Sequence, residues 1–355
     1  MKRIGFLFEK ICSLENIEQA IDNAAKKKKN RKSVQRILKN KKAYAEKIRE
    51  ILLSGEYKPK PYKTFTIYDG SSRKERTIHC PAFYPDQIVH WAIMQVLQPI
   101  IMRSMYAYSC GSVPGRGIDY GRKAIARWLK RDRKNTKYCL KLDITKFYPH
   151  IDKEKLKEMF RRKIKDERAL ALIDAVIDSH DEGMPIGTYT SPWFANFSME
   201  GLDHYIKEDL GIKYYLRYTD DMVLFGANKK KLHIARRKIE EYIKPLNLTL
   251  KNNWQVFKVD SRPVDILGYK FYHGKTTLRR RNSLRIRRKA KRLHDKNIIT
   301  PTDARGFLSH MGQIKHSNSR EFYKKYIKPC VNIRNLRRIV SNADRIKYTA
   351  CVNQC

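Results

Sequence analysis

The chain has 355 residues, enough for two or three domains or one large multi-lobed core, and its 41% hydrophobic content suits a folded, soluble protein. Lys and Arg number 77 against 36 Asp and Glu, and the formal charge of +41 far exceeds what solubility requires. This excess predicts a polyanionic partner, with nucleic acid as the first expectation. The sequence contains no stretch of about 18 uninterrupted apolar residues, so no membrane partner is expected.

Two further features concern the cellular compartment. The apolar start of the chain is interrupted at Glu9 and Lys10 before a signal-peptide core can form, which predicts a cytoplasmic protein. The seven cysteines are scattered and include no Cys-x-x-Cys pair, a pattern that favours reduced thiols over a disulfide framework or a zinc site.

The first part of the chain is predicted to be mainly helical and strongly basic. Residues 13–55 have helical character, and the segment 26–42 carries ten Lys or Arg and no acid. Alternating residues then predict a hairpin of strands 59–68 and 75–81 around a basic turn. A helix over 86–105, a glycine-rich loop over 106–117 and a helix over 124–130 are expected next.

The segment around residue 143 places an acid at the end of a buried strand. Residues 139–142 predict the strand, and Asp143 follows it, shortly before Phe147 and Tyr148. An Asp at this position is often only a turn residue or a helix cap, so the segment alone leaves its role open. Helices are expected after the N-cap residue Asp152, over 169–177, and from Ser191 to near Gly211.

An adjacent pair of acids lies between two apolar, strand-favouring runs, 214–218 and 222–225. The pattern predicts a hairpin with Asp220 and Asp221 at its tip. Acids are ordinary turn residues, so a solvated turn is the alternative interpretation of this segment taken alone.

The last third of the chain is expected to form a basic, mainly helical lobe. The segment 275–296 carries eleven Lys or Arg against one Asp, which predicts a helix that packs weakly and binds phosphate. It is preceded by a basic helix over 229–244, by alternating residues over 246–253, and by a single strand over 264–272. Helices over 301–310 and 320–328 follow, whereas 333–355 has no clear pattern.

Phosphoryl transfer between nucleotides is a chemistry that would use these acids together. It requires two divalent cations held about 4 Å apart by oxygen ligands, which carboxylates on neighbouring strands supply. Asp143 and Asp220 can converge if their strands pair, with Asp221 nearby and the carbonyl of Ile144 as a further oxygen. We therefore expect two Mg²⁺ ions, with Mn²⁺ as a substitute.

Four separated segments resemble motifs A, B, C and E of reverse transcriptases, in the order of that family. They are Leu142-Asp-Ile-Thr-Lys-Phe-Tyr-Pro-His-Ile151, Met184-Pro-Ile-Gly-Thr-Tyr-Thr-Ser-Pro192, Tyr218-Thr-Asp-Asp221 and Ile266-Leu-Gly-Tyr269. The resemblance implies an RNA-directed DNA polymerase with the α+β right-hand fold, in which an antiparallel-sheet palm is joined to fingers and a basic helical thumb. The divisions expected are an N-terminal extension 1–57, fingers 58–135, palm 136–273, thumb 274–330 and tail 331–355.

The same resemblance implies the roles of individual residues. Asp143, Asp220 and Asp221 would be catalytic and, with Ile144, would bind the metals. Tyr148 resembles the aromatic gate that excludes a ribose 2′-hydroxyl, although a core aromatic is its alternative. The deoxynucleotide site would also include Lys74, Arg76, Ile186, Gly187 and Lys251, and the primer and template would contact Leu267, Gly268, Arg279, Arg280, Arg281, Arg287 and Arg288.

The biological role is less narrowly defined. Ile186 replaces the Gln that most reverse transcriptases carry, which resembles the error-prone enzymes of diversity-generating retroelements. Pro192 is instead similar to retron and group II intron enzymes, and an antiphage-defence reverse transcriptase or a catalytically silent RNA-binding scaffold are further alternatives. The implied partners are an RNA template, a DNA primer, deoxynucleotides, and either a small accessory protein or a structured non-coding RNA.

Overall fold

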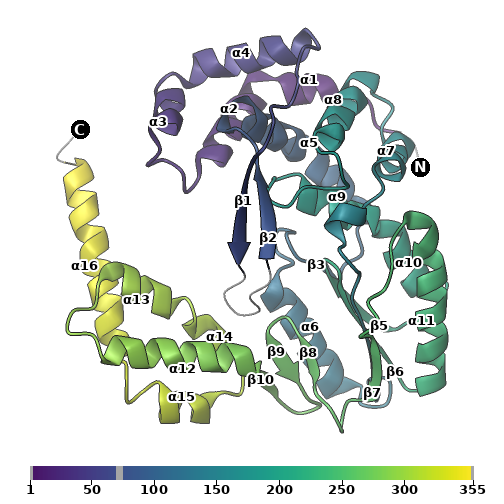
Figure 1. Ribbon diagram of the computed structural model, residues 1–355, viewed down its shortest axis with the longest axis vertical. Coiled ribbons are helices and arrows are strands. Elements are labelled where there is room, and N and C mark those ends of the chain that lie inside the picture. The colour runs from purple at the N-terminus through teal and green to yellow at the C-terminus, as the bar shows by residue number, and fades with distance from the viewer. Residues whose placement is uncertain (1–2, 69–74, 353–355) are drawn as a thin grey trace. The chain divides into compact units, whose positions relative to one another are not determined.

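A computed structural model describes residues 3–68 and 75–352, with side chains described as far as residue 345. The chain divides into two compact units (Figure 1). The first comprises Met1–Gly121 and Leu140–Val256, and the second comprises Arg122–Cys139 and Phe257–Cys355.

The first unit begins with a group of helices that contains the predicted helical stretch. Residues 13–55 form three helices, because the lysine-rich residues 26–31 form turns that separate the first from the second. Asn16 connects this group to the long helix α5, since its side-chain amide donates to the carbonyl of Ala92 at 3.1 Å. The helices are α1 (Leu7–Cys12), α2 (Leu14–Ala25), α3 (Lys32–Lys39), α4 (Lys41–Leu53) and α5 (Ile88–Ser104).

The predicted hairpin that precedes α5 is present. Strand β1 (Lys63–Tyr68) pairs antiparallel with β2 (Glu75–Cys80), so that Tyr68 lies opposite Glu75. The basic turn between the strands, which includes Lys74, lies outside the described residues.

Five strands form the larger sheet, in the order β3-β5-β6-β4-β7. Strands β5 and β6 form the predicted hairpin, with Tyr218 opposite Asp221. The two-residue strand β3 lies within the expected glycine-rich loop and pairs parallel with β5, so one edge of the sheet is not antiparallel. The strands are β3 (Ser109–Cys110), β4 (Tyr138–Leu142), β5 (Tyr214–Tyr218), β6 (Asp221–Gly226) and β7 (Gln255–Lys258).

Helices of the first unit pack with this sheet around an aromatic core. Phe160 lies against Phe194 and Phe197, with ring centroids 5.1 and 4.8 Å away. The single helix expected from Ser191 is two helices, α9 and α10, which meet at Met199. In Figure 1, α10 and α11 run side by side. The helices are α7 (Lys153–Lys163), α8 (Glu167–Asp178), α9 (Ser191–Ser198), α10 (Glu200–Glu208) and α11 (Lys229–Ile243).

The second unit contains a small sheet where one strand was predicted. Residues 264–272 form two antiparallel strands, β8 (Val264–Ile266) and β9 (Tyr269–Phe271), and β10 (Thr276–Leu278) adds to β9. The prediction of a single strand was wrong because Leu267 and Gly268 both have positive φ, 57° and 82°, which is the geometry of a tight two-residue hairpin turn.

The remaining helices of the second unit include one that was not predicted. Residues 333–355 were expected to lack a pattern, yet Ile333–Val352 forms helix α16, which contacts α13. The expectation was wrong although the signal was present, because Ile333, Leu336, Val340 and Ala343 recur at helical spacing. The other helices are α6 (Ile118–Arg131, which begins in the first unit), α12 (Arg280–His294), α13 (Pro301–Leu308), α14 (Met311–Lys315) and α15 (Arg320–Tyr326).

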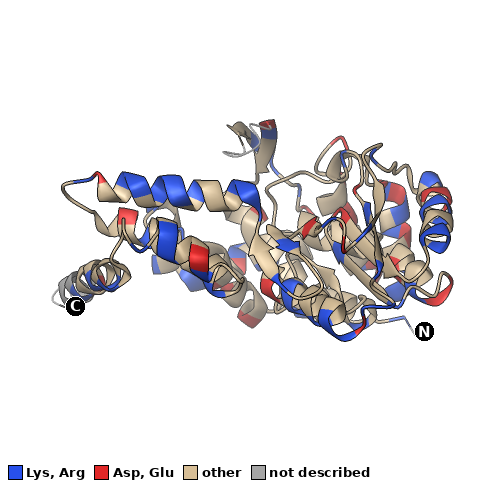
Figure 2. Ribbon diagram, turned by 90° about the horizontal axis from the view of Figure 1, so that it is seen from below, with Lys and Arg blue, Asp and Glu red and all other residues tan. Residues whose placement is uncertain are grey.

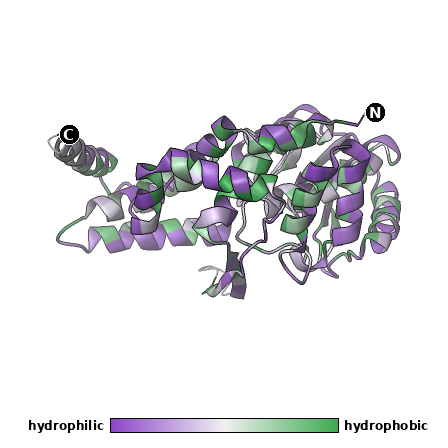
Figure 3. Cartoon of the chain, turned by 90° about the horizontal axis from the view of Figure 1, so that it is seen from above, coloured by the Kyte–Doolittle hydropathy of each residue, from purple (hydrophilic) through white to green (hydrophobic). Residues whose placement is uncertain are grey.

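Helix α12 carries the predicted concentration of positive charge. Figure 2 shows Lys and Arg along most of its length. It is anchored by Ile286, Ala290 and Leu293, which are buried, and Figure 3 shows hydrophilic and hydrophobic bands alternating along the helices. Among the described helices, none combines the length and the apolarity that a bilayer-spanning segment needs.

A buried ion pair connects α10 to the hairpin of Asp220 and Asp221. The guanidinium of Arg217 on β5 is fully buried and donates to both carboxylate oxygens of Asp203, at 2.8 and 2.6 Å. Tyr215 donates to the same carboxylate at 2.8 Å.

The other donors of this guanidinium bind groups around the turn. Arg217 donates to the carbonyl of Thr219 at 3.0 Å, to the side chain of Asn196 at 3.1 Å and to the hydroxyl of Ser109 at 2.7 Å. Asn196 in turn donates to the carbonyl of Gly111 at 2.9 Å. A planar fork with five donors is needed to reach all of these acceptors at once.

We expect Arg217→Lys to lower the free energy of unfolding by about 3 kcal/mol or more, because lysine keeps the charge but leaves buried acceptors without donors. Urea denaturation measures the change. Arg161→Lys is the matched control, since Arg161 pairs with Asp174 at the surface with 47% of its side chain exposed. The control should cost less than about 1 kcal/mol. A similar loss for both variants would contradict a special role for the buried pair.

Candidate active site

The turn between β5 and β6 presents the two acids at the end of the hairpin. Asp220 is a turn residue, and Asp221 is the first residue of β6. Thr219 has a φ of 59°, a left-handed conformation that is costly for a β-branched residue. Two hydrogen bonds hold it there: its amide donates to the carbonyl of Cys110 at 3.2 Å, and its carbonyl accepts from Arg217. Hydrogen bonds to Cys110 on β3 and to Arg217 of the buried ion pair therefore fix the turn.

Asp143 lies just beyond the end of β4, the strand next to β6 in the sheet. The following residue, Ile144, forms an antiparallel bridge with Leu250. The bridge uses the carbonyl of Asp143, which accepts from the amide of Lys251 at 2.8 Å, and the amide of Thr145. It does not use the carbonyl of Ile144, which fits the expectation that this oxygen is available to a ligand.

The side chain of Lys251 forms an ion pair with Asp143. Its ammonium lies 2.6 Å from Oδ2 of Asp143, with about a third of the lysine side chain exposed. The other oxygen of the same carboxylate, Oδ1, is buried and has no hydrogen-bond partner among the described residues. A buried carboxylate oxygen without a partner is costly, so this atom is suited to a cation that binds there.

The electrostatics of Asp220 indicate that the acids converge. Burial, together with the charges of Asp143 and Asp221, raises the pKa of Asp220 to about 6, while Lys251 opposes them. Carboxylates influence each other in this way only when they are close together. The expected convergence of Asp143, Asp220 and Asp221 is therefore present in the fold.

Two further side chains reach the same region. Burial, together with the charge of Asp220, raises the pKa of Tyr148 to about 12, and Arg76 on β2 lowers it. Tyr148 begins a single turn of 3₁₀-helix, Tyr148–His150, and is half-buried beside Phe147. It is thus neither a fully buried core aromatic nor remote from the acids.

The loop after α8 packs tightly between these elements. Gly187 has a φ of 125°, and a Cβ there would lie 2.6 Å from the carbonyl oxygen of His79 on β2. The carbonyl of its neighbour Ile186 accepts from the amide of His79 at 2.7 Å. At the other end of the loop, the amide of Met184 donates to the carbonyl of Tyr148 at 2.9 Å. The loop therefore connects β2 to the aromatic that follows Asp143, and only glycine fits at position 187.

The comparison with known families agrees with this geometry. A model described as reverse transcriptase (RNA-dependent DNA polymerase) matches residues 60–271. The chain belongs to the reverse transcriptase family. The expected RNA-directed DNA polymerase is thereby confirmed.

Individual relatives of this reverse transcriptase come from bacteria. The Retron Ec73 reverse transcriptase of Escherichia coli is 27% identical over 300 residues, which cover 78% of this chain and 91% of the relative. The Retron Se72 reverse transcriptase of Salmonella heidelberg is 25% identical over 237 residues, with 64% and 59% covered. The chain therefore spans somewhat less than two thirds of the second relative.

A solved structure supports the fold. Apo telomerase from Candida tropicalis superposes with a TM-score of 0.50 at 12% identity, over 86% of this chain and 62% of the telomerase chain. This likeness concerns the fold alone and confirms the right-hand polymerase expectation.

Divalent metals are general in the reverse transcriptase family, and the acids here fit such ions. Oδ1 of Asp143 is buried without a partner, and the carboxylates repel one another. Asp143, Asp220 and the carbonyl of Ile144 are the oxygens that would hold a metal, which would activate a primer hydroxyl and balance the charge of leaving pyrophosphate. The described residues nevertheless include no group of three or more His, Cys, Asp or Glu side chains with metal-binding geometry. The chain thus offers fewer side-chain ligands than three acids suggest.

The predicted primer and template residues lie in the second unit of the reverse transcriptase, whereas the acids lie in the first. Leu267 and Gly268 form the β8–β9 turn, and the carbonyl of Gly268 accepts from the amide of Arg279. Arg279 pairs with Asp265 at 2.5 Å, and the guanidinium of Arg287 lies 4.4 Å from the centroid of the Tyr326 ring. The exposed members of the predicted set are Arg280, Arg281, Arg287 and Arg288.

Sequence reasoning missed the residues that support the acids. Arg217 and Asp203 carry opposite charges inside otherwise apolar patterns, on β5 and α10 respectively. The available signal was a charged residue at a position where the strand or helix period predicts an apolar one. Charged residues are rarely buried without a partner. Their pairing across 14 residues was not readable from the spacing.

We expect Asp220→Asn to raise the melting temperature of the metal-free protein at pH 7 by about 2 °C or more, because it removes a buried charge that its neighbours repel. The wild type should gain stability from millimolar Mg²⁺, and the variant should gain less. Differential scanning calorimetry measures both. Asp181→Asn, at an exposed position, is the control and should change neither value. Equal stabilisation of Asp220→Asn and wild type by Mg²⁺ would contradict metal binding at Asp220.

Proposed function

We propose that this reverse transcriptase makes DNA on an RNA template by nucleotidyl transfer with two Mg²⁺ ions bound at Asp143, Asp220 and the carbonyl of Ile144, with Asp221 as the third catalytic acid. The observation that carries the proposal is the mutual electrostatic influence of Asp143, Asp220 and Asp221 at the ends of two neighbouring strands. A protein with a formal charge of +41 that only bound nucleic acid would have no need to bring three acids together.

Four further residues are assigned to the binding of the incoming nucleotide. Tyr148 limits the room for a ribose 2′-hydroxyl, since its ring is half-buried and held between Phe147 and the acids. Arg76 on the exposed start of β2 is a donor for triphosphate oxygens. Gly187 provides a flat, close-packed surface for the nascent base pair, and Lys251 beside Asp143 is the cation closest to the phosphates.

The biological role that the relatives favour is that of a retron-like or defence-associated enzyme. Two of them are retron reverse transcriptases, one of which matches over most of its length. Error-prone synthesis of the diversity-generating type is a second candidate, and a specific observation favours it: Ile186, an aliphatic residue that is partly exposed, adjoins the exposed Gly187. A structured RNA or an accessory protein as partner belongs to both proposals.

Primer extension tests the chemistry. Wild type should extend a DNA primer on an RNA template in Mg²⁺, and Asp220→Asn should reduce the rate at least about a hundredfold because charge stabilisation of the transition state is lost. Asp181→Asn should extend as wild type does. Equal extension by wild type and Asp220→Asn, or no extension by wild type, would contradict the proposal and favour a catalytically silent RNA-binding scaffold.

Sequencing the products tests fidelity. If Ile186 relaxes discrimination, wild type should misincorporate opposite template adenines, and Ile186→Gln should lower that frequency several-fold because a polar side chain restores a hydrogen bond at the base pair. Ile186→Val is the matched control and should remain inaccurate. Unchanged error frequencies in Ile186→Gln would remove the argument for the diversity-generating role.

A further inference from the structure

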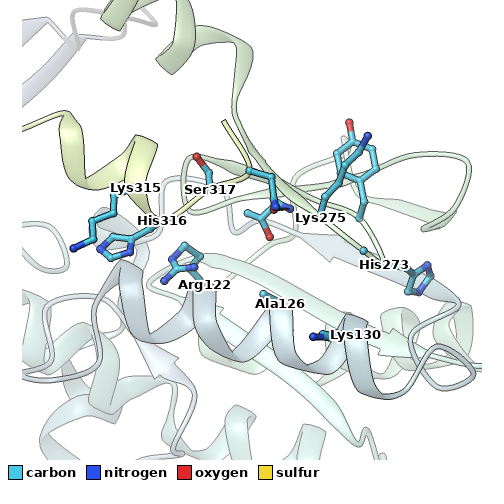
Figure 4. A pocket seen from close by; sticks show the side chains of 12 residues that line it. Arg122, Ala126, Lys130, His273, Lys275, Lys315, His316 and Ser317 are labelled. Carbon is cyan, nitrogen blue, oxygen red and sulfur yellow. Dashed lines mark hydrogen bonds between the residues drawn. The ribbon is translucent and has the colours of Figure 1, made fainter. Parts of the chain in front are cut away.

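A pocket in the second unit lies outside everything assigned so far. Its volume is about 390 Å³, and it is formed by α6, the turn from β9 to β10 and the segment after α14. Figure 4 shows α6 along one side, with Arg122, Ala126 and Lys130 in succession, and Lys315, His316 and Ser317 on the other. The lining residues are Arg122, Ala126, Lys130, Tyr272, His273, Gly274, Lys275, Thr276, Lys315, His316, Ser317 and Asn318.

The lining has the chemistry of an anion site. Four of the twelve residues are Lys or Arg and two are His, and none of the twelve is acidic. Lys130 and Lys315 are exposed, and no acidic partner is recorded for either in the described part of the chain. Two lysines without an acidic partner, beside further cations, are costly unless an anion joins them, so the pocket favours a negatively charged ligand.

The walls are held in place before any ligand arrives. The amide of Asn318 donates to the carbonyl of Thr276 at 2.7 Å, and the amide of Thr276 donates to the side chain of Asn318 at 2.8 Å. This reciprocal pair fixes the segment after α14 against β10. His273 is fixed as well, because its Nδ1 lies 2.7 Å from Asp260 and its Nε2 contacts Thr136 at 3.2 Å. A prearranged site loses little entropy when it binds.

The arrangement of charge fits a strand better than a single nucleotide. Arg122 and Lys130 lie on one face of α6, eight residues and therefore about 12 Å apart, with the small Ala126 between them. A line of cations of this length suits successive phosphates. The one Tyr of the lining is poorly placed to stack a base, because the ammonium of Lys275 lies 5.2 Å from the centroid of the Tyr272 ring.

We propose that this pocket binds the phosphodiester backbone of a nucleic-acid strand, through Arg122, Lys130, Lys315 and His316, as a contact additional to the primer and template residues assigned above. Binding through phosphates is independent of base sequence and weakens with salt. The proposal does not require catalysis, so it is tested by binding alone and its failure is distinct from a failure of the polymerase assignment.

The experiment compares the full-length wild type with Lys130→Ala/Lys315→Ala. Fluorescence anisotropy follows labelled single-stranded RNA and DNA of mixed sequence, roughly 20 nucleotides long so that they exceed one binding site. The variant should bind at least about tenfold more weakly, because two charge-assisted contacts are lost. Its plot of log affinity against log salt should be flatter by about 1.4, which corresponds to two phosphates on a single strand.

Two matched variants complete the design. Lys230→Ala/Lys238→Ala removes the same charge from exposed positions of α11 and should bind within about twofold of wild type, since an exposed charge with no ligand contributes little. Lys130→Arg/Lys315→Arg keeps the cations and should also bind as wild type does. Circular dichroism checks that each variant is folded.

Competition with ATP and pyrophosphate separates a strand from a free phosphate compound. Weaker binding of ATP by Lys130→Ala/Lys315→Ala with unchanged strand binding would overturn the proposal in favour of a nucleotide pocket. Equal effects of the pocket and α11 variants on strand affinity and salt slope would overturn it in favour of a general charge effect. Loss in the pocket variant alone, for RNA or for DNA, supports it and shows which strand is preferred.

Discussion

The buried ion pair of Arg217 and Asp203 is the interaction on which the hairpin of Asp220 and Asp221 depends. A guanidinium without solvent contact is strongly unfavourable unless each donor finds an acceptor. Here the acceptors come from α9, α10, β3 and the turn itself. The hydrogen bonds of this one side chain therefore connect four parts of the chain. The Thr219 conformation, which is costly for a β-branched residue, is sustained by the same hydrogen bonds.

That rigidity matters because the turn holds groups that repel one another. Asp143 and Asp221 are close enough to Asp220 for their charges to raise its pKa, and Lys251 opposes that effect only in part. A flexible turn would separate the acids and relieve the repulsion. Because hydrogen bonds fix the turn, the acids stay together, and their electrostatic repulsion favours the binding of cations. The loop from Gly183 to Gly187 also supports the site, since its backbone hydrogen bonds connect strand β2 to Tyr148 and Gly187 leaves no room for a side chain.

The acids and the basic helix α12 lie in different units of the chain. The first contains the acids, and the second contains α12 and the pocket between α6 and the segment after α14. Within the predicted primer and template set, Arg279 pairs with Asp265, whereas Arg280, Arg281, Arg287 and Arg288 are exposed. Basic residues therefore fall into two groups. Some stabilise the fold, and others are available to phosphate.

The sequence by itself determined the chemistry and most of the elements, because motifs and short-range periodicity are local properties. The hairpin of Asp220 and Asp221, the strand before Asp143, and the basic character of α12 were all readable in this way. Tertiary structure decided what depends on distant contacts: the parallel pairing of β3, the turn at Leu267 and Gly268, and the partners of Arg217. These features lack a periodic signal, since each is stabilised by atoms far away in the chain. The acids were visible in the sequence, but the buried charge that positions them became visible only in the fold.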